Sequence, residues 1–178
     1  MIKVILVTAM FPMCVYAQKI KVDEIDKFTK QHKVFTTEAA LREGMDFQAY
    51  IFGQKYDNDC YLTVRLSIGS GKTGKVFSVP EGASMIFVLD NDETLDIKNA
   101  EYELSSIGAA AKGLSGSQSF GAVIKYKLNE QALKVLAQQK IKAYRIYLSD
   151  SYIEADANER QSERLYKIVN LINDKGND

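Results

Sequence analysis

The chain has 178 residues, and its 23 lysines and arginines balance 23 aspartates and glutamates, so the formal net charge is zero. This length suits one domain with a core of its own, and the neutral balance excludes the broad basic field that nucleic-acid binding needs. With one histidine and two cysteines in all, the usual zinc ligand sets are excluded as well, and we expect no cofactor, no metal and no nucleic acid.

Residues 1–17 are typical of a secretory signal peptide. A lysine near the start precedes an apolar run, and the end of the run offers a signal peptidase the small Ala17 at position −1 and a tolerable Val15 at position −3. The run is interrupted by Pro12 and is shorter than the roughly 20 residues of a membrane span. We expect cleavage after Ala17 and a periplasmic or extracellular product, residues 18–178, with no membrane span. Lipid anchoring through Cys14 is the alternative, although the residues before it match a lipoprotein signal poorly.

The first half of this product is rich in strand patterns. Residues 19–25 alternate charged and apolar side chains and predict an edge strand, and 32–37 predict a short second strand. Helix formers over 37–43, closed by Gly44, predict one helical turn. Turn-forming residues separate the further strands that we expect over 45–56, 61–68, 75–79, 84–89 and 93–107, the last broken near Asn99.

Residues 69–73, Gly-Ser-Gly-Lys-Thr, end like a phosphate-binding P-loop. That loop reads G-x-x-x-x-G-K-[ST], and here Leu66 stands where its first glycine belongs. The loop must also open a helix, whereas residues 75–79 read as a strand. We therefore interpret the segment as the flexible loop of a β-hairpin that joins strands 61–68 and 75–79.

Small residues from Gly108 to Gly121 cannot fill a core and predict a mobile loop, and a strand follows over 120–128. Asn129 is a good N-cap, and the flanking Leu128 and Leu133 are placed as a hydrophobic staple, so we expect a helix from 130 to 139.

A strand over 142–148 precedes the last helix, for which Asp156 and Glu159 predict a capping box. Apolar residues in that helix recur at i, i+3, i+4 and i+7 and form one face: Leu165, Ile168, Val169 and Ile172. Hairpin-linked strands followed by late helices predict a single α+β domain, a mainly antiparallel β-sheet with two C-terminal helices packed on it.

The sequence offers little catalytic chemistry. His32 could serve one Ser-His-Asp arrangement, but no G-x-S-x-G nucleophile motif accompanies it. Oxygen-bearing residues over 90–96 resemble a calcium loop, but Leu95 stands where that loop needs glycine. Cys60 is the single cysteine of residues 18–178, and we expect a buried free thiol rather than an intermolecular bridge. We assign no catalytic residue and no metal ligand.

The strand over 142–148 carries the candidate binding residues. Tyr144 alternates to one face, and Arg145 and Tyr147 to the other. Tyrosine and arginine are enriched at the centres of binding surfaces. We take these three residues as candidates for ligand binding.

Two segments, "VDEIDKFTKQHKVFTT" and "YKLNEQALKVLAQQKIKAYRIYLSD", together with the Ala17-Gln18 junction, resemble small, functionally uncharacterised exported proteins of Bacteroides-type bacteria. The resemblance implies a periplasmic or surface location in a Gram-negative cell and no activity. We expect an exported, non-enzymatic binding or accessory module of the cell envelope, whose partner is an unknown protein or a small envelope ligand. An envelope hydrolase that uses His32 or an acidic pair is the alternative.

Overall fold

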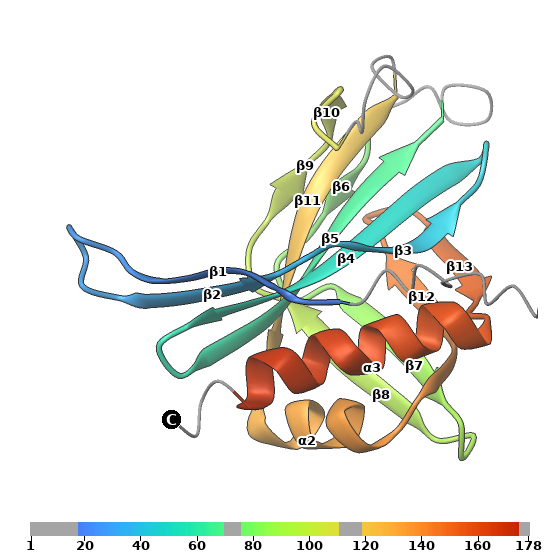
Figure 1. The fold of residues 1–178 in the computed structure, drawn as a ribbon. Helices are drawn as coiled ribbons and strands as arrows, with labels where there is room; N and C mark the ends of the chain where they lie inside the picture. Colours follow the sequence, from blue (N-terminus) through green and yellow to red (C-terminus); the bar gives the residue numbers. More distant parts are fainter. Residues whose placement is uncertain (1–17, 70–75, 111–118, 175–178) are drawn as a thin grey trace, which may run out of the picture.

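The computed structural model describes residues 18–69, 76–110 and 119–174. They form an α+β fold in which both described helices lie on the same side of a large antiparallel sheet (Figure 1), as the sequence predicts. The strands are β1 (Ile20–Ile25), β2 (His32–Thr36), β3 (Ala39–Glu43), β4 (Phe47–Tyr56), β5 (Asp59–Ile68), β6 (Ser78–Val79), β7 (Ser84–Leu89), β8 (Thr94–Asn99), β9 (Glu103–Leu104), β10 (Ser106–Ile107), β11 (Phe120–Leu128), β12 (Ile141–Tyr147) and β13 (Tyr152–Asp156), and the helices are α2 (Glu130–Gln138) and α3 (Glu159–Asp174).

The main sheet has the order β1-β2-β4-β5-β11-β8-β7-β12-β13, with β3 added to β4 and β10 added to β11. Strand β1 ends this order on one side, so the expected edge strand is confirmed, and β13 ends it on the other. Strands β6 and β9 pair with each other in a separate two-stranded sheet.

The predicted hairpin between residues 61–68 and 75–79 is wrong. Strand β5 is flanked along its length by β4 and β11, so neither of its edges is free for another strand. Ser78–Val79 pairs instead with Glu103–Leu104. Most of the P-loop-like segment, 70–75, lies outside the described residues, but the residues after it, Val76 and Phe77, are not helical and lead into β6.

The predicted helical turn over 37–43 is also wrong, because these residues form β3. Ala39 and Leu41 are buried while the residues between and after them are not, which is the period-2 pattern of a strand with one face in the core. Pairing with Ala49 and Tyr50 of β4 supplies the hydrogen bonds, with an irregularity between Ala40 and Arg42. Pairing with the edge of β4 therefore outweighs the local helix propensity of these residues.

The late helices form where the sequence predicts them. Asn129 caps α2, since its side chain accepts a 2.7 Å hydrogen bond from the Ala132 N–H. The capping box of α3 lies two residues later than expected, between Asn158 and Gln161, whose side chains each accept from the other's backbone N–H at 3.0 and 2.8 Å. Asp156 cannot take that role because it is the last residue of β13.

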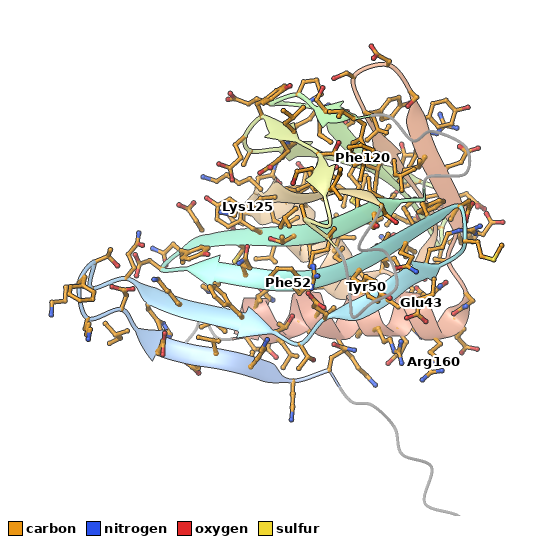
Figure 2. All side chains as sticks on the ribbon, turned by 90° about the horizontal axis from the view of Figure 1, so that it is seen from above. Glu43, Tyr50, Phe52, Phe120, Lys125 and Arg160 are labelled. Carbon is orange, nitrogen blue, oxygen red and sulfur yellow. The ribbon has the colours of Figure 1, made fainter. Side chains whose placement is uncertain are left out.

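The core fills the space between the sheet and the helices. The predicted apolar face of α3 is fully buried, and it packs with α2 and against β2, β3 and β4. Figure 2 looks down on the opposite face of the sheet, on which Tyr50 and Phe52 of β4 lie, with α3 beneath. Within the predicted mobile loop, residues 111–118 lie outside the description, whereas Ala110 is 2 % exposed and packs against Gly121 of β11.

Candidate functional site

The three predicted binding residues are separated by the alternation of β12. Tyr144 points into the core and is 1 % exposed, and its buried hydroxyl has no hydrogen-bond partner within the described part of the chain. Burial raises the pKa of this hydroxyl well above its ordinary value. Arg145 and Tyr147 share the outer, half-buried face of the strand. The structure therefore brings Arg145 and Tyr147 together on the outer face and buries Tyr144 in the core. Tyr144 and Arg145 both line the groove described below, and Tyr147 does not.

Arg145 organises a cluster on that outer face. Its Nε donates to Glu154 Oε2 at 2.8 Å, and one terminal nitrogen donates to the Tyr147 hydroxyl at 3.3 Å. The guanidinium carbon lies 4.3 Å from the ring centroid of Tyr152, a distance that suits a cation–π contact. Hydrogen bonds with Tyr147 and Glu154 raise the pKa of the guanidinium. We call Arg145, Tyr147, Tyr152 and Glu154 the Arg145 cluster.

Half of this cluster comes from β13, a strand that the sequence analysis did not predict. The antiparallel register sets Glu154 opposite Arg145 and Tyr152 opposite Tyr147. Cross-strand pairs of this kind stabilise a two-stranded ribbon. The signal that could have found them is the polar turn Ser149-Asp150-Ser151 followed by alternating Tyr152 and Glu154.

A groove of about 660 Å³ lies beside the Arg145 cluster. Ile86 and Val88 of β7 and Ala143 of β12 supply its apolar floor, since all three occupy outer-face positions of paired strands. The polar part of its lining comes from four different strands and consists of Arg42, Thr94, Tyr144, Arg145, Glu154 and Asp156. A depression of this size, with an apolar floor and a few convergent polar groups, is the usual form of a ligand site.

The charges around the groove are balanced and mostly paired. Arg145 is bonded to Glu154, and Arg42 is bonded to Asp46 at 3.0 Å. The Phe47 backbone N–H and then Arg42 hold the pKa of Asp46 below its ordinary value. The side chain of Asp156 forms no hydrogen bond or ion pair with any residue that the structure describes. The groove thus offers one unpaired carboxylate and two arginines held in place by carboxylates.

A second polar surface lies on the outer face of β2, β4, β5 and β11. Phe35, Tyr56 and Tyr61 pack edge to face with centroids 5.5 and 6.1 Å apart, and Lys125 Nζ lies 5.5 Å from both tyrosine rings. Figure 2 shows Lys125 on this face of the sheet, on which Phe52 also lies. The rings contact each other by their edges rather than forming a flat platform, so this surface offers less to a ligand than the groove does.

His32 lies at the start of β2, in the β1–β2 hairpin. Its Nε2 is 2.7 Å from Asp23 Oδ1, and among the described residues no serine, threonine or cysteine side chain hydrogen bonds to it. It does not line the groove. Among the described residues, this arrangement supplies a histidine oriented by a carboxylate but no hydroxyl or thiol hydrogen bonded to the ring.

Cys60 is 3 % exposed and free, and burial raises the pKa of its thiol, as expected for an inert core cysteine. Residues 18–69, 76–110 and 119–174 contain no group of three or more His, Cys, Asp or Glu side chains that could hold a metal ion. In the same ranges, neither helix has the length and apolar character that crossing a bilayer requires.

Comparison of the chain with models of protein families, with curated proteins and with solved structures finds no match.

Proposed function

We propose that this chain is an exported, non-enzymatic binding or accessory module of the cell envelope, and that the groove beside the Arg145 cluster holds its ligand. The signal-peptide pattern of residues 1–17 supports export. The observation that carries the binding role is the groove itself, because it combines an apolar floor with polar groups from separate strands. Its volume of about 660 Å³ falls within the range of small-molecule sites.

The charges of the groove favour a short peptide as the ligand class. Arg42 and Arg145 supply donors for a carboxylate, whereas Asp156 supplies a free acceptor for an ammonium group. A ligand with one charge of each sign leaves the balanced site neutral, and an excess of either sign would bury an unpaired charge. Small apolar side chains of such a peptide would cover Ile86 and Val88.

The same contacts favour binding over hydrolysis. Glu154 is held by Arg145, so it is a poor proton donor for an acidic pair with Asp156. His32 is outside the groove, and no hydroxyl or thiol of the described residues hydrogen bonds to its ring. We therefore propose that the groove retains its ligand unchanged.

The test is an NMR titration of the full ¹⁵N-labelled chain with tri-alanine bearing free termini. We expect saturable shifts of the amides of Ala143, Arg145 and Glu154, and no cleavage of the peptide. Acetylating the peptide's amino end, or the substitution Asp156→Asn, should weaken binding about tenfold, since each removes one charge of a pair. Asp150→Asn is the matched control, because Asp150 lies in the turn before β13 and does not line the groove. Shifts that are absent at millimolar peptide, or equal in the two variants, would exclude this ligand class.

A further inference from the structure

The β1–β2 hairpin extends beyond the body of the molecule, and its turn lies at the far end of that extension (Figure 1). We call residues 25–31 the tip. Phe28 in the tip is 83 % exposed and Ile25 is 68 % exposed. Single exposed apolar side chains are common on soluble proteins, but a phenylalanine so open at a projecting end is placed to contact something outside the chain.

The tip has a defined backbone structure. Asp26 Oδ1 accepts hydrogen bonds from the N–H groups of Phe28 at 2.9 Å and Thr29 at 2.8 Å. The Asp26 carbonyl accepts from Lys30 N–H, and Asp26 N–H donates to the Gln31 carbonyl, both at 2.8 Å. These bonds satisfy the N–H groups of Asp26, Phe28, Thr29 and Lys30 within the turn, which lowers the cost of moving them out of bulk water. They also hold Phe28 in its exposed position.

The charges of the tip leave it positive at its outer end. Lys27 and Lys30 flank Phe28, and Lys27 Nζ lies 4.9 Å from the phenyl centroid. Neither lysine has an acidic partner within residues 18–69, 76–110 and 119–174. The acids behind them are engaged, because Asp26 pairs with Lys33 at 2.5 Å and Asp23 pairs with His32.

Glu24, the remaining acid of the hairpin, lies opposite Lys33 in the strand register. The tip itself, residues 25–31, therefore presents an exposed aromatic ring and two ammonium groups that have no acidic partner among the described residues. Lysines beside an exposed aromatic ring form the pattern by which peripheral proteins contact anionic lipid.

We propose that this tip is a membrane-docking element that places Phe28 among the headgroups of an anionic bilayer, with Lys27 and Lys30 against lipid phosphates. A flat bilayer fits a projecting turn, since the hairpin carries the tip clear of the body. The two lysines, which have no acidic partner among the described residues, favour anionic lipid over a neutral apolar cavity of a protein. This role is independent of the groove and goes beyond the proposed binding function.

The chain contains no tryptophan, so Phe28→Trp introduces a single fluorescent reporter at the tip. The full-length variant is mixed with phosphatidylglycerol vesicles and, separately, with phosphatidylcholine vesicles. We expect a blue shift of emission, and quenching by brominated lipid, with the anionic vesicles only. Met45→Trp is the matched control, because Met45 is 100 % exposed in a different turn, and its emission should not change. Residues 1–17 are the same in both variants, so any affinity that they add does not distinguish them.

The lysines are tested by Lys27→Gln combined with Lys30→Gln in the Phe28→Trp background. At about 1 kcal/mol for each lysine near an anionic surface, the partition coefficient should fall roughly 30-fold. The control pair is Lys98→Gln with Lys134→Gln, on β8 and α2, and should change partitioning by less than about threefold. The proposal is overturned by an absent emission shift, by equal shifts of the two tryptophans, by equal shifts on the two vesicle types, or by equal losses from the two lysine pairs. An absent shift would assign the tip to a protein partner instead.

Discussion

Gly53 of β4 and Ile172 of α3 approach so closely that a side chain at position 53 has no room. A Cβ atom on Gly53 would lie 2.8 Å from Ile172 Cγ2 and 3.1 Å from Ile168 Cγ2. Two residues along β4, the buried Lys55 reaches the Ile172 carbonyl with its Nζ at 3.5 Å. The last turns of α3 are thus fixed to β4 by steric fit and by a cation at the helix C-terminus, where it complements the helix dipole.

Substituting Gly53→Ala should destabilise the fold by about 1–3 kcal/mol, because the added methyl group forces α3 away from the sheet. Urea unfolding measures the change. The matched test repeats the substitution in an Ile172→Ala background, where the obstructing methyl is absent and Gly53→Ala should cost less than about half as much. Additive effects of the two substitutions would contradict the contact.

Tyr144→Phe should leave stability unchanged or raise it by up to about 1 kcal/mol. The lost hydroxyl is buried without a partner among the described residues, so the substitution removes a desolvated polar group and no hydrogen bond. Thermal unfolding of the variant checks this result, with Tyr147→Phe as the control that does lose a bond, to Arg145. A loss of more than about 1 kcal/mol for Tyr144→Phe would mean that its hydroxyl is bonded in solution.

The Cys60 thiol should resist iodoacetamide in the folded chain and react readily in denaturant. Only the thiolate is nucleophilic, and burial, which outweighs the opposing effect of Lys55, raises the pKa of this thiol while the fold blocks access. Peptide mapping by mass spectrometry separates Cys60 from Cys14 and reports each modification. Equal labelling of Cys60 with and without denaturant would contradict its burial.

The sequence predicted most of the fold because its strongest patterns agree with the tertiary contacts. The spacing of Leu165, Ile168, Val169 and Ile172 identified the buried face of α3, and Asn129 marked the start of α2. The prediction from sequence failed where pairing between segments distant in the chain determines the structure. The sequence of residues 39–43 does not indicate that they lie beside an edge of β4 with which they can pair. The sequence around residue 75 likewise does not indicate that β11 pairs with the second edge of β5.

The candidate site was predicted only in part, for the same reason. The alternation of side chains along one strand separates Arg145 and Tyr147 from Tyr144. It does not identify the residues that lie beside them on the neighbouring strand. Tyr152 and Glu154 join the cluster through the register of β12 with β13, and the groove also needs β7, β8 and the distant Arg42 of β3. A groove assembled from five strands has no signature in any one stretch of sequence.

The tip of the β1–β2 hairpin should remain formed well into the acidic range. The Lys33 ammonium, with the Thr29 and Phe28 N–H groups, holds the pKa of Asp26 far below its ordinary value of 3.8. Because the pKa of Asp26 is lower in the folded chain than in the unfolded chain, the stabilisation that its carboxylate gives to the tip is complete above about pH 4. It is lost only as the pH falls through the folded-state pKa. The hydrogen bond with Asp26 also raises the pKa of Lys33 above 10.5. In alkaline solution the stabilisation by this ion pair is therefore lost only as the pH rises through that raised pKa.

NMR shifts of the Phe28 and Thr29 amides report this titration directly. They should stay constant from neutral pH to about pH 4 and move only in stronger acid. Asp26→Asn removes the charge that Lys33 contacts and keeps the acceptor oxygen, so the variant should show no acid transition at these amides and a partly loosened tip at every pH. Asp96→Asn is the control, because Asp96 lies on β8 and should leave the transition of the tip unchanged. An amide transition centred near pH 3.8 in the unsubstituted chain would mean that Lys33 and the turn do not hold the Asp26 carboxylate, and the rigid presentation of Phe28 would lose its basis.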